Sequence, residues 1–470
     1  MKRGITTGAL GAAGLGAVTA AALLTGTAPA SAHDGLVSAV VPSANTRDGV
    51  RDNVLANGLR ERAVAWGQLP LTNPGTASGD VRYGYNTSNG GPLTQDPKEA
   101  FKTEPDKNAY LVLAGHHYLY QGHEGGPAGY VTRIDLDQTD PAKRVTLVTD
   151  QDVSGAKLPD FDGVTWDPFS HQLLLTAESG APTGGVFAVP LDGQGDPTAA
   201  ATRLTTLGSG GYEGVQNDAD GNVWIVEDIG GAAAGTGGKG KVPNSYVYRF
   251  RPTDRTDLTK GGTLQALQVL RADGAPATAA QLQVDGRDPF IPALHTYGSS
   301  FATTWVTVTG AGSTAGAKAA GATPFKRPEN GVFRPGTGFR EFYFTETGDT
   351  NADSDLPGAF GGVFKLSQSG PSAATGRISP VLLGDVAHTG LDNISFATRD
   401  DLLVVEDAGD ALHAQRNALD SGYLLDLGDA RRARTPARWL AEGRDASATY
   451  DALFSPGYND GDNEITGIHT

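Results

Sequence analysis

Short runs of alternating apolar and polar residues recur along the chain, and most of them end in acidic residues. Three segments share one order: FDGVTWDPFSHQLLLTAESG (161–180), YEGVQNDADGNVWIVEDIGG (212–231) and LDNISFATRDDLLVVEDAGD (391–410). Each begins near an acidic residue, continues as an alternating strand and ends in a carboxylate pair or a carboxylate beside glycine. FYFTETGDTNADSD (342–355) gives only the second half. Because a repeated supersecondary unit determines the architecture, the pattern predicts an all-β fold.

The strand-end acids set the length of the repeating unit. Consecutive acids lie 54, 49, 119 and 60 residues apart: Glu124, Glu178, Glu227, Glu346 and Glu406. The interval of 119 is about two periods, so we expect one degenerate unit in the 260–320 region. Units of roughly 40–50 residues with several short strands are typical of a β-propeller. We therefore predict a β-propeller of about six blades, with antiparallel strands around a central channel.

Glycine-rich or polar turns follow the acidic strand ends, and a strand that contains an aromatic residue then returns. The returning strands fall within 179–192, 244–252 and 358–367. Asp220-Gly221 is a dipeptide of the kind that makes a tight hairpin turn. The repeating unit is thus expected to contain antiparallel hairpins.

The first 32 residues have the order of a secretory signal peptide. A basic start (MKRGITTG) precedes an apolar stretch of small residues and an Ala-Ser-Ala box, so we expect cleavage near Ala32-His33 and a secreted protein. A membrane anchor is the weaker alternative, because no stop-transfer flank follows, and no later segment has ~18 consecutive apolar residues. We expect residues 33–107 to form an N-terminal arm and the start of the propeller, and 108–470 to complete the same domain.

Composition and charge narrow the classes of function. The chain has no cysteine, so it has neither disulfides nor thiolate ligands. Its net charge of −16 argues against nucleic acid or anionic lipid as a partner. Solubility and salt tolerance are the alternative reason for the acidity. We expect no nucleic-acid or membrane partner, and we expect a monomer.

Acids at the ends of neighbouring propeller strands converge on one mouth of the channel. Gathered carboxylates repel one another unless cations neutralise them, since unpaired buried charge is costly. Alternatively, each acid caps a hydrated turn. For the set that recurs in register we favour metal binding: Glu178, Glu213, Glu227, Asp228, Glu346 and Glu406. Because all these ligands are oxygens, they favour a hard ion, above all Ca²⁺.

Two loops have alternating oxygen-bearing residues. Asp349, Asn351, Asp353 and Asp355 have the spacing of a calcium loop, although Phe360 stands where an EF-hand has its bidentate glutamate. The segment 459–464 (NDGDNE) is similar. Each loop is open between a Ca²⁺ site and a solvated turn.

Three further motifs have a chemical and a structural interpretation. KRPEN (326–330) places an arginine fork two residues from Glu329, which suits phosphate beside a metal ligand, or simply a surface ion pair. His123-Glu124 is either a ligand pair or a structural histidine with a hydrated glutamate. GTGGKGK (235–241) lacks the Ser/Thr of a phosphate loop and is predicted to be a flexible glycine loop from which Lys239 or Lys241 is able to reach a substrate. No GxSxG occurs, so a serine hydrolase has little support.

With these residues assembled, the chain resembles the PhoX-type alkaline phosphatase family, secreted bacterial propellers with a calcium–iron cluster at the channel mouth. The resemblance covers nearly the whole mature chain. It rests on several weak motifs in the right order: YGYNT (83–87), GHEGG (122–126), FDGVTWDPFSHQLLLTAESG (161–180), LGSGGYEGV (207–215), VEDIGG (226–231), SYVYRF (245–250), GATPFKRPEN (321–330), LDNISF (391–396) and NDGDNEITGIH (459–469).

Position by position, the resemblance implies roles for particular residues. Glu213 and Glu329 match metal-binding glutamates, and Arg327 matches the arginine that grips the phosphate. The stretches that carry further ligands contain Glu178, Asp228, Asp392 and Asn393.

The chain departs from the family at several places. The cysteine that bridges the irons is missing, and its place falls near Phe161-Asp162. The paired glutamate becomes Glu178-Ser179, Tyr212 replaces a histidine, and the twin-arginine signal is absent. A thiolate-bridged di-iron centre is therefore excluded. An Asp162 carboxylate suits hard metals, so calcium is favoured and iron in another form remains open.

These inferences lead to two hypotheses of different classes. The favoured one is a secreted calcium-dependent phosphoester hydrolase, acting on a phosphorylated small molecule, with a metal cluster at the channel mouth. The other is a non-catalytic calcium-stabilised propeller that binds a ligand or partner at the same mouth.

Overall fold

The structure is a computed structural model of the 470-residue chain, and it describes residues 52–73, 81–87, 102–126, 128–310, 312–443 and 465–469. The expected signal peptide (1–32) and the acidic loop at 459–464 lie outside these ranges. Strands dominate the described part, and the helices are short. The all-β prediction is confirmed.

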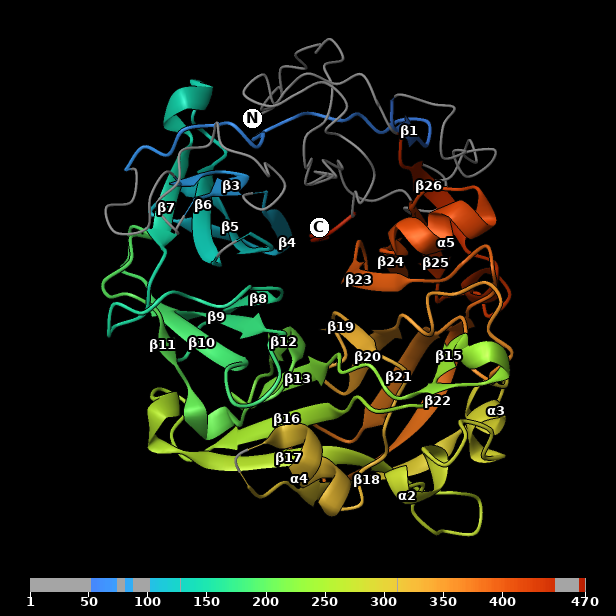
Figure 1. Cartoon of the computed structure of the whole chain (residues 1–470). Helices are drawn as coiled ribbons and strands as arrows, with labels where there is room; N and C mark the ends of the chain where they lie inside the picture. The colour runs from blue at the N-terminus through green and yellow to red at the C-terminus, as the bar shows by residue number, and fades with distance from the viewer. Residues whose placement is uncertain are drawn as a thin grey trace.

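The strands form sheets arranged radially around a common centre (Figure 1). The first blade contains β4 (Glu104–Leu113), β5 (His116–Glu124), β6 (Tyr130–Asp135) and β7 (Val145–Thr149). The second contains β8 (Val164–Asp167), β9 (Gln172–Ala177), β10 (Gly185–Pro190) and β11 (Thr202–Arg203). The third contains β12 (Tyr212–Asn217), β13 (Val223–Glu227), β16 (Val247–Pro252) and β17 (Gly262–Val269).

Two more blades complete the set in the described residues. The fourth contains β19 (Pro328–Phe333), β20 (Glu341–Glu346), β21 (Gly362–Gln368) and β22 (Thr375–Leu383). The fifth contains β23 (Leu391–Phe396), β24 (Asp401–Glu406), β25 (Ser421–Asp426), β26 (Ala437–Ala441) and the N-terminal strand β1 (Val54–Leu55). Strands β4, β8, β12, β19 and β23 face the centre (Figure 1). The β-propeller prediction is confirmed, with five inner strands in the described residues where about six blades were predicted.

The long interval between Glu227 and Glu346 has a different origin from the one expected. Strand β18 (Phe301–Thr307) pairs with both β17 and β22, and so joins the outer edges of the third and fourth blades into one 9-stranded sheet. The 260–320 region therefore supplies outer strands and the helices α2 (Ala279–Leu282), α3 (Phe290–Leu294) and α4 (Ser313–Ala319). It is an insertion between blades, and no degenerate blade with its own inner strand lies in its described residues.

Hydrophobic cores fill the interfaces between neighbouring blades. Leu174 of the second blade packs in one cluster with Val215 of the third. Trp224 of the third blade packs against Phe342 of the fourth, with ring centroids 4.9 Å apart. The sheet of each blade is thus buried on both faces. This burial explains why strands such as QLLLTA (172–177) and VWIVE (223–227) are almost continuously apolar.

The C-terminal segment closes the ring between the fifth and first blades. Ile465 and Ile468 pack in one cluster with Leu403 of β24. On the other side, the Thr466 hydroxyl donates to the carbonyl of Pro105, at 2.7 Å, in β4. Figure 1 shows the C-terminus at the centre of the ring, between β4 and β23.

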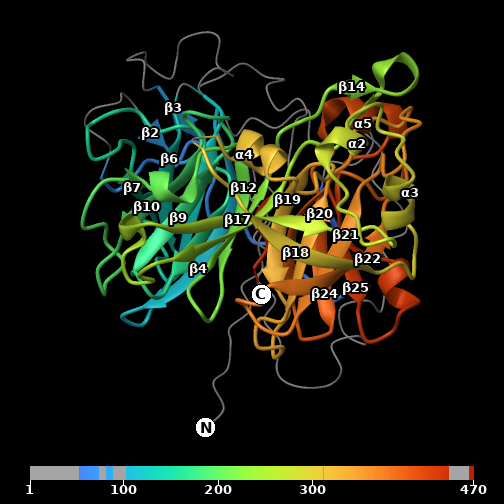
Figure 2. The ribbon, with the colours of Figure 1, turned by 90° about the horizontal axis from the view of Figure 1, so that it is seen from below.

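One end of the strands carries most of the short helices. Helices α2, α4 and α5 (Gly409–Arg416) and strand β14 (Ala233–Ala234) lie toward the same end, seen edge-on in Figure 2. This is the end at which the second strand of each blade finishes, because α5 directly follows β24. We call it the mouth. In the described residues, no helix has the length and apolar character needed to cross a bilayer.

Candidate metal centre

Each inner strand begins with an irregular pair of residues at the mouth. In β12 the register shifts between Tyr212 and Val215, so Glu213 and Gly214 together oppose one residue of β13. The same shift occurs in β4, β19 and β23. In the second blade, Thr176 bonds both Asp162 and Gly163 through its backbone, which gives the same two-against-one arrangement. Bulges re-aim side chains and are frequent beside functional sites.

The first member of every irregular pair is an acid. The pairs are Asp106-Lys107, Asp162-Gly163, Glu213-Gly214, Glu329-Asn330 and Asp392-Asn393. All these acids are buried, with exposed fractions between 4% and 7%. The propeller therefore presents one buried carboxylate from each inner strand at the centre of the mouth.

The ends of the second strands add further carboxylates. Glu124 is the last residue of β5, Glu178 and Asp228 directly follow β9 and β13, and all three meet the inner acids. Oxygen atoms within 4.8 Å of one another form three overlapping groups: Asp106, Asp162 and Glu213; Glu124, Asp162 and Glu178; and Glu178, Glu213 and Asp228. Because the groups share members, they form one continuous set, which we call the carboxylate cluster.

The cluster has the donor set of a site for hard cations. Oδ1 of Asp162 and Oδ1 of Asp228 are buried and have no hydrogen-bond partner among the described residues. A buried carboxylate oxygen without a partner loses its hydration with no compensation. Oxygen ligands in this number suit Ca²⁺ and similar ions. The residues present therefore fit a divalent cation.

The raised pKa values of the cluster acids also favour bound cations. Burial, followed by the neighbouring carboxylates Asp162, Glu178 and Glu329, raises the pKa of Glu213 well above its ordinary value. Burial and Asp106 likewise raise the pKa of Asp392 to about 8. The pKa values of Glu124, Asp162, Glu178 and Glu329 are also raised, in each case chiefly by burial. The cluster thus resists holding all its negative charges without cations.

Arg327 lies at the rim of the cluster. Its Nε donates to Oδ2 of Asp228 at 2.7 Å, and its Nη2 lies 3.7 Å from Oε1 of Glu329. Its side chain is 23% exposed, whereas that of Asp228 is 6% exposed. Burial alone lowers an arginine pKa, but Glu329 and Asp228 outweigh burial and raise the pKa of Arg327. Its φ of 58° is rare for a residue with a side chain, and such conformations gather at functional sites.

Some members of the centre were not predicted from the sequence. Asp106 and Lys107 come from the bulge of β4, and Asn330 from the bulge of β19. The Lys107 ammonium donates to Oδ1 of Asn330 at 2.7 Å. The segment of Asp106 and Lys107, PDKNAY, lacks the acid-pair pattern of the repeats. Its available signal was a pair of opposite charges at the start of a strand that ends in apolar residues.

Three of the strand-end acids chosen from the sequence lie one residue away from the position that faces the cluster. Glu227, Glu346 and Glu406 pair with Tyr212, Pro328 and Leu391, each of which directly precedes an inner acid. The residue after each of them, such as Asp228, holds the position of Glu124 and Glu178. Side chains alternate between the two faces of a strand, so a slip of one residue changes the face.

Glu227 and Glu346 have partners within the blades. Glu227 accepts hydrogen bonds from the hydroxyls of Thr314 and Tyr248, at 2.6 and 2.8 Å. Glu346 contacts Nε2 of His295 at 2.9 Å and accepts from the backbone N–H of Lys326. Both carboxylates therefore serve the packing of strands and helices and lie outside the carboxylate cluster.

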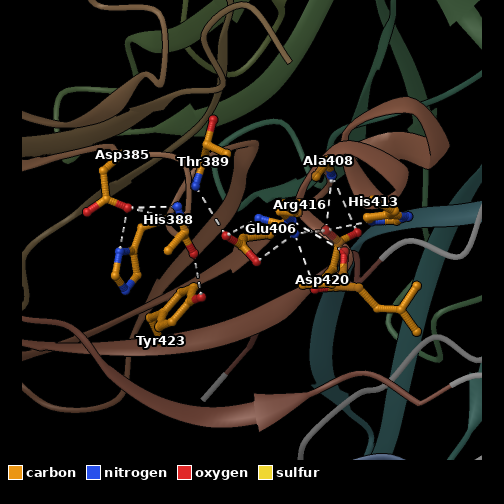
Figure 3. A network of polar contacts seen from close by, with 12 residues as sticks. Asp385, His388, Thr389, Glu406, Ala408, His413, Arg416, Asp420 and Tyr423 are labelled. Atoms are coloured by element: carbon orange, nitrogen blue, oxygen red, sulfur yellow. Dashed lines mark hydrogen bonds and ion pairs between the residues drawn. The ribbon is translucent and has the colours of Figure 1, made fainter. Parts of the chain in front are cut away.

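Glu406 belongs to a separate polar network in the fifth blade, shown in Figure 3. Arg416 of α5 donates to both of its oxygens, at 3.1 and 3.2 Å. The same guanidinium reaches Asp420 at 3.0 Å, and His413 lies 3.0 Å from that aspartate. Glu346 and Glu406, which were expected to be metal ligands, thus lie outside the carboxylate cluster, and protein donors contact their oxygens.

His123 takes the structural alternative. Its ring stacks on Tyr130 with centroids 4.1 Å apart, and its Nε2 lies 2.8 Å from the Thr132 hydroxyl. Burial lowers the pKa of His123 to about 3. His123 holds the same strand position as Glu227 and Glu346, whose side chains pack within their blades. Glu124, the next residue, faces the cluster.

The acids of the loop at 349–355 are bound by the chain's own cations. The Lys326 ammonium lies 2.8 Å from both oxygens of Asp349, and Asp355 pairs with Arg287 at 2.6 Å. Lys239 lies 4.0 Å from Asp353. These carboxylates point to different partners, so the loop lacks the convergent ligands that Ca²⁺ requires.

Fold and site together define a class: a β-propeller with a buried carboxylate centre and an arginine at its rim. The family model "Alkaline phosphatase PhoX" matches residues 241–469. This match confirms the PhoX-type resemblance for the C-terminal part of the chain. The matched part contains Arg327, Glu329 and Asp392, whereas all acids of the carboxylate cluster precede it.

Comparisons with individual proteins add little. No curated protein matches the chain. A GH43_1 enzyme from Xanthomonas citri is 12% identical, covers 68% of this chain and 87% of its own, and has a TM-score of 0.34. The periplasmic gluconolactonase PpgL from Pseudomonas aeruginosa is 14% identical, covers 68% and 67%, and has a TM-score of 0.33. The Cps50 (Swd1) β-propeller domain from Myceliophteria thermophila is 10% identical, covers 73% and 89%, and has a TM-score of 0.32. At these values the likenesses carry no functional argument.

Proposed function

We propose that this chain is a secreted phosphoester hydrolase whose carboxylate cluster holds divalent cations, above all Ca²⁺. The observation that carries the proposal is the position of Arg327, a guanidinium at the partly exposed rim of a carboxylate cluster in which four of six acids are buried. This arginine and Glu329 lie in the part of the chain that the PhoX family model matches. The expected signal peptide supports action outside the cell.

The cation-holding residues are five acids of the carboxylate cluster and Glu329 beside them. They are Glu124, Asp162, Glu178, Glu213, Asp228 and Glu329. Asp106, the sixth acid of the cluster, is next to Lys107 in the chain. Divalent cations bound there supply Lewis-acid polarisation of a phosphoryl group and a lowered pKa for water. The unpartnered oxygens of Asp162 and Asp228 are the best candidates for direct ligands.

Arg327 supplies the contact with the substrate. Its Nε and Nη2 face Asp228, and its Nη1 has no hydrogen-bond partner among the described residues. When the charge of Asp228 is neutralised, the planar fork becomes available for two oxygens of a phosphate group. Such paired, charge-assisted hydrogen bonds are the strong ones, and they offset the charge that develops in phosphoryl transfer.

The chain has no cysteine and no GxSxG motif. We assign the carboxylates of the centre to cations and not to covalent attack. We therefore assign the attack on phosphorus to water. The substrate is a phosphorylated small molecule, and the protein acts as a monomer.

Turnover with and without cations tests this function. Purified chain should hydrolyse p-nitrophenyl phosphate or its bis-ester in Ca²⁺, lose activity in EGTA, and regain it when Ca²⁺ is restored. Arg327→Lys is the matched variant, because it keeps the charge and loses the fork. Calcium-loaded protein that turns over neither ester would overturn the enzyme and favour a propeller that only binds ligands at the mouth.

A further inference from the structure

Lys107 is the one long cationic side chain that an inner strand sends into the centre in the described residues. The equivalent second positions of the other bulges hold Gly163, Gly214, Asn330 and Asn393. The two glycines leave no room for a side chain. A Cβ at Gly163 would lie 2.4 Å from the carbonyl oxygen of Glu213, and one at Gly214 would lie 2.7 Å from Oδ1 of Asn330. The inner strands lie in contact at these two glycines. The space beneath the acids is therefore filled by the Lys107 side chain of the first blade.

The lysine reaches across the ring to the fourth blade. Its side chain is buried, with an exposed fraction of 2%, and its ammonium donates to Oδ1 of Asn330 at 2.7 Å. The contact fixes the amide of Asn330, whose Nδ2 then donates to Oδ1 of Asp392 at 3.2 Å. In turn, Nδ2 of Asn393 donates to Oδ1 of Asp106 at 3.1 Å and to Oδ2 of Asp392 at 2.8 Å. A closed polar chain thus links the first, fourth and fifth blades.

The Lys107 ammonium offsets part of the negative charge of this chain of contacts. The Lys107 ammonium interacts favourably with Asp106 and Asp392, and more weakly with Asp162 and Glu213. Two carboxylates, two amides and one ammonium form the floor of the centre. By contrast, the oxygens without partners, on Asp162 and Asp228, belong to the side of the cluster that Arg327 borders.

A second buried lysine pairs with a carboxylate outside the cluster. The Lys326 ammonium holds both oxygens of Asp349. Two other acids of that loop, Asp353 and Asp355, pair with Lys239 and Arg287, so Lys326 serves one carboxylate and no converging set of ligands.

We propose that the Lys107 ammonium is a resident cation of the centre, which takes the place of one metal ion at its floor. The ammonium offsets one of the two negative charges of Asp106 and Asp392, although an Asp106 oxygen lies near those of Asp162 and Glu213. Divalent cations are confined to the oxygens of Glu124, Asp162, Glu178, Glu213, Asp228 and Glu329. Asp392 and Asn393 serve the lysine, although their sequence context matches a ligand-bearing stretch of the family. The inference rests on the cation site of the proposed function, and it holds whether or not the protein hydrolyses a phosphoester.

Calcium content measures the substitution directly. Metal-free protein would be dialysed against Ca²⁺, separated from free ion, and assayed by elemental analysis. Lys107→Met should bind about one more Ca²⁺ per chain than the wild type, because two acids at the floor then lack a counter-ion. Lys107→Gln, which keeps a polar contact to Asn330, should gain the same ion. In EGTA both variants should melt at a lower temperature than the wild type, and Ca²⁺ should restore it.

Lys326→Met is the matched control, because it removes an equally buried lysine that pairs with Asp349 outside the cluster. It should lower the melting temperature without adding calcium. A second route does not need a lysine variant to fold: Asp392→Asn should keep the calcium content of the wild type, whereas Glu178→Gln should reduce it.

The outcomes decide between the alternatives. Unchanged calcium content in both Lys107 variants, or loss of calcium in Asp392→Asn, would overturn the inference. If the wild type binds no calcium, acquisition of one ion by Lys107→Met still supports it, and failure to acquire one overturns it. Hydrolysis of p-nitrophenyl phosphate by the wild type is measured separately. A failure of the proposed function is therefore distinguishable from a failure of the inference about Lys107.

Discussion

Arg327 and Asp228 form an ion pair between the fourth and third blades, in which Nε and Nη2 of the arginine contact the same carboxylate oxygen at 2.7 and 2.6 Å. The other oxygen of Asp228 is buried, and nothing in the described part of the chain donates a hydrogen bond to it. One carboxylate thus faces a fixed guanidinium on one side and the centre of the cluster on the other. This position couples cation binding to the freedom of Arg327, since neutralising Asp228 weakens its hold on the arginine.

We expect Arg327→Lys to weaken inhibition by inorganic phosphate about 10- to 100-fold and to lower turnover. The lysine keeps the charge but loses the planar fork, and a charge-assisted hydrogen bond is worth about 1.5–3 kcal/mol. Calcium content and melting temperature should stay close to those of the wild type. Inhibition constants and melting curves would be measured on the same preparations. A lower melting temperature with unchanged phosphate inhibition would make Arg327 a structural ion-pair residue.

Chelation should destabilise the wild type. A cation that binds the native cluster and not the unfolded chain stabilises by mass action, by about 2.7 kcal/mol when its concentration is a hundredfold above Kd. Differential scanning calorimetry in Ca²⁺ and in EGTA measures the effect. Mg²⁺ at the same concentration is the control, because it accepts fewer protein ligands in stricter geometry. A melting temperature indifferent to EGTA would show that the acids are neutralised without metal.

The chelated protein should become less stable as the pH rises. Burial and neighbouring acids raise the pKa of Glu213 and Asp162, and that of Asp392 to about 8. A carboxyl whose pKa is higher in the folded than in the unfolded state binds more protons when folded. Its contribution is therefore present below the ordinary pKa and is lost as the pH rises through the folded value. The melting temperature in EGTA should fall from pH 4.5 to about 8, and Ca²⁺ should flatten the decline. A melting temperature that rises over this interval in EGTA would contradict the prediction.

The sequence was sufficient to predict the propeller and part of its centre. The acid, strand and acid-pair order repeats because each blade begins and ends at the same mouth. The repeat in the sequence therefore predicts the repeat of blades in the propeller. Glu178, Glu213 and Asp228 were selected in this way, and the structure brings them together. The region from 260 to 320 was misinterpreted because interval length alone does not distinguish a blade from an insertion such as β18 and its flanking helices.

The rest of the centre depends on features that a sequence does not display. A strand that ends in two polar residues, such as Glu406-Asp407, does not reveal which of them faces the mouth, and that choice is set by the bulge in the neighbouring strand. Lys107 and Asn330 meet across 223 positions of the chain, and only closure of the ring brings them together. Pairing between distant blades has no local signature.

Adjacent residues at the end of β13 provide a direct test of the strand register. Asp228 faces the cluster, whereas Glu227 faces the interior of the blade and accepts hydrogen bonds from Thr314, Tyr248 and the backbone N–H of Tyr246. Asp228→Asn should therefore lower calcium affinity. Its effect on the melting temperature should be smaller in EGTA than in Ca²⁺, because the substitution also removes one of several crowded negative charges.

Glu227→Ala should do the reverse. It leaves the buried hydroxyl of Tyr248 and the half-buried hydroxyl of Thr314 without their acceptor. The loss costs about 1–3 kcal/mol for the buried group, so the melting temperature should fall in both Ca²⁺ and EGTA while calcium content is retained. Glu227→Gln serves as the milder control: burial raises the pKa of Glu227 to about 8, so near neutral pH the amide replaces a protonated carboxyl of similar shape and should cost little. Isothermal titration with Ca²⁺ and calorimetric melting on all three variants separate the two faces. Loss of calcium in Glu227→Ala together with its retention in Asp228→Asn would mean that the strand presents the opposite face to the mouth.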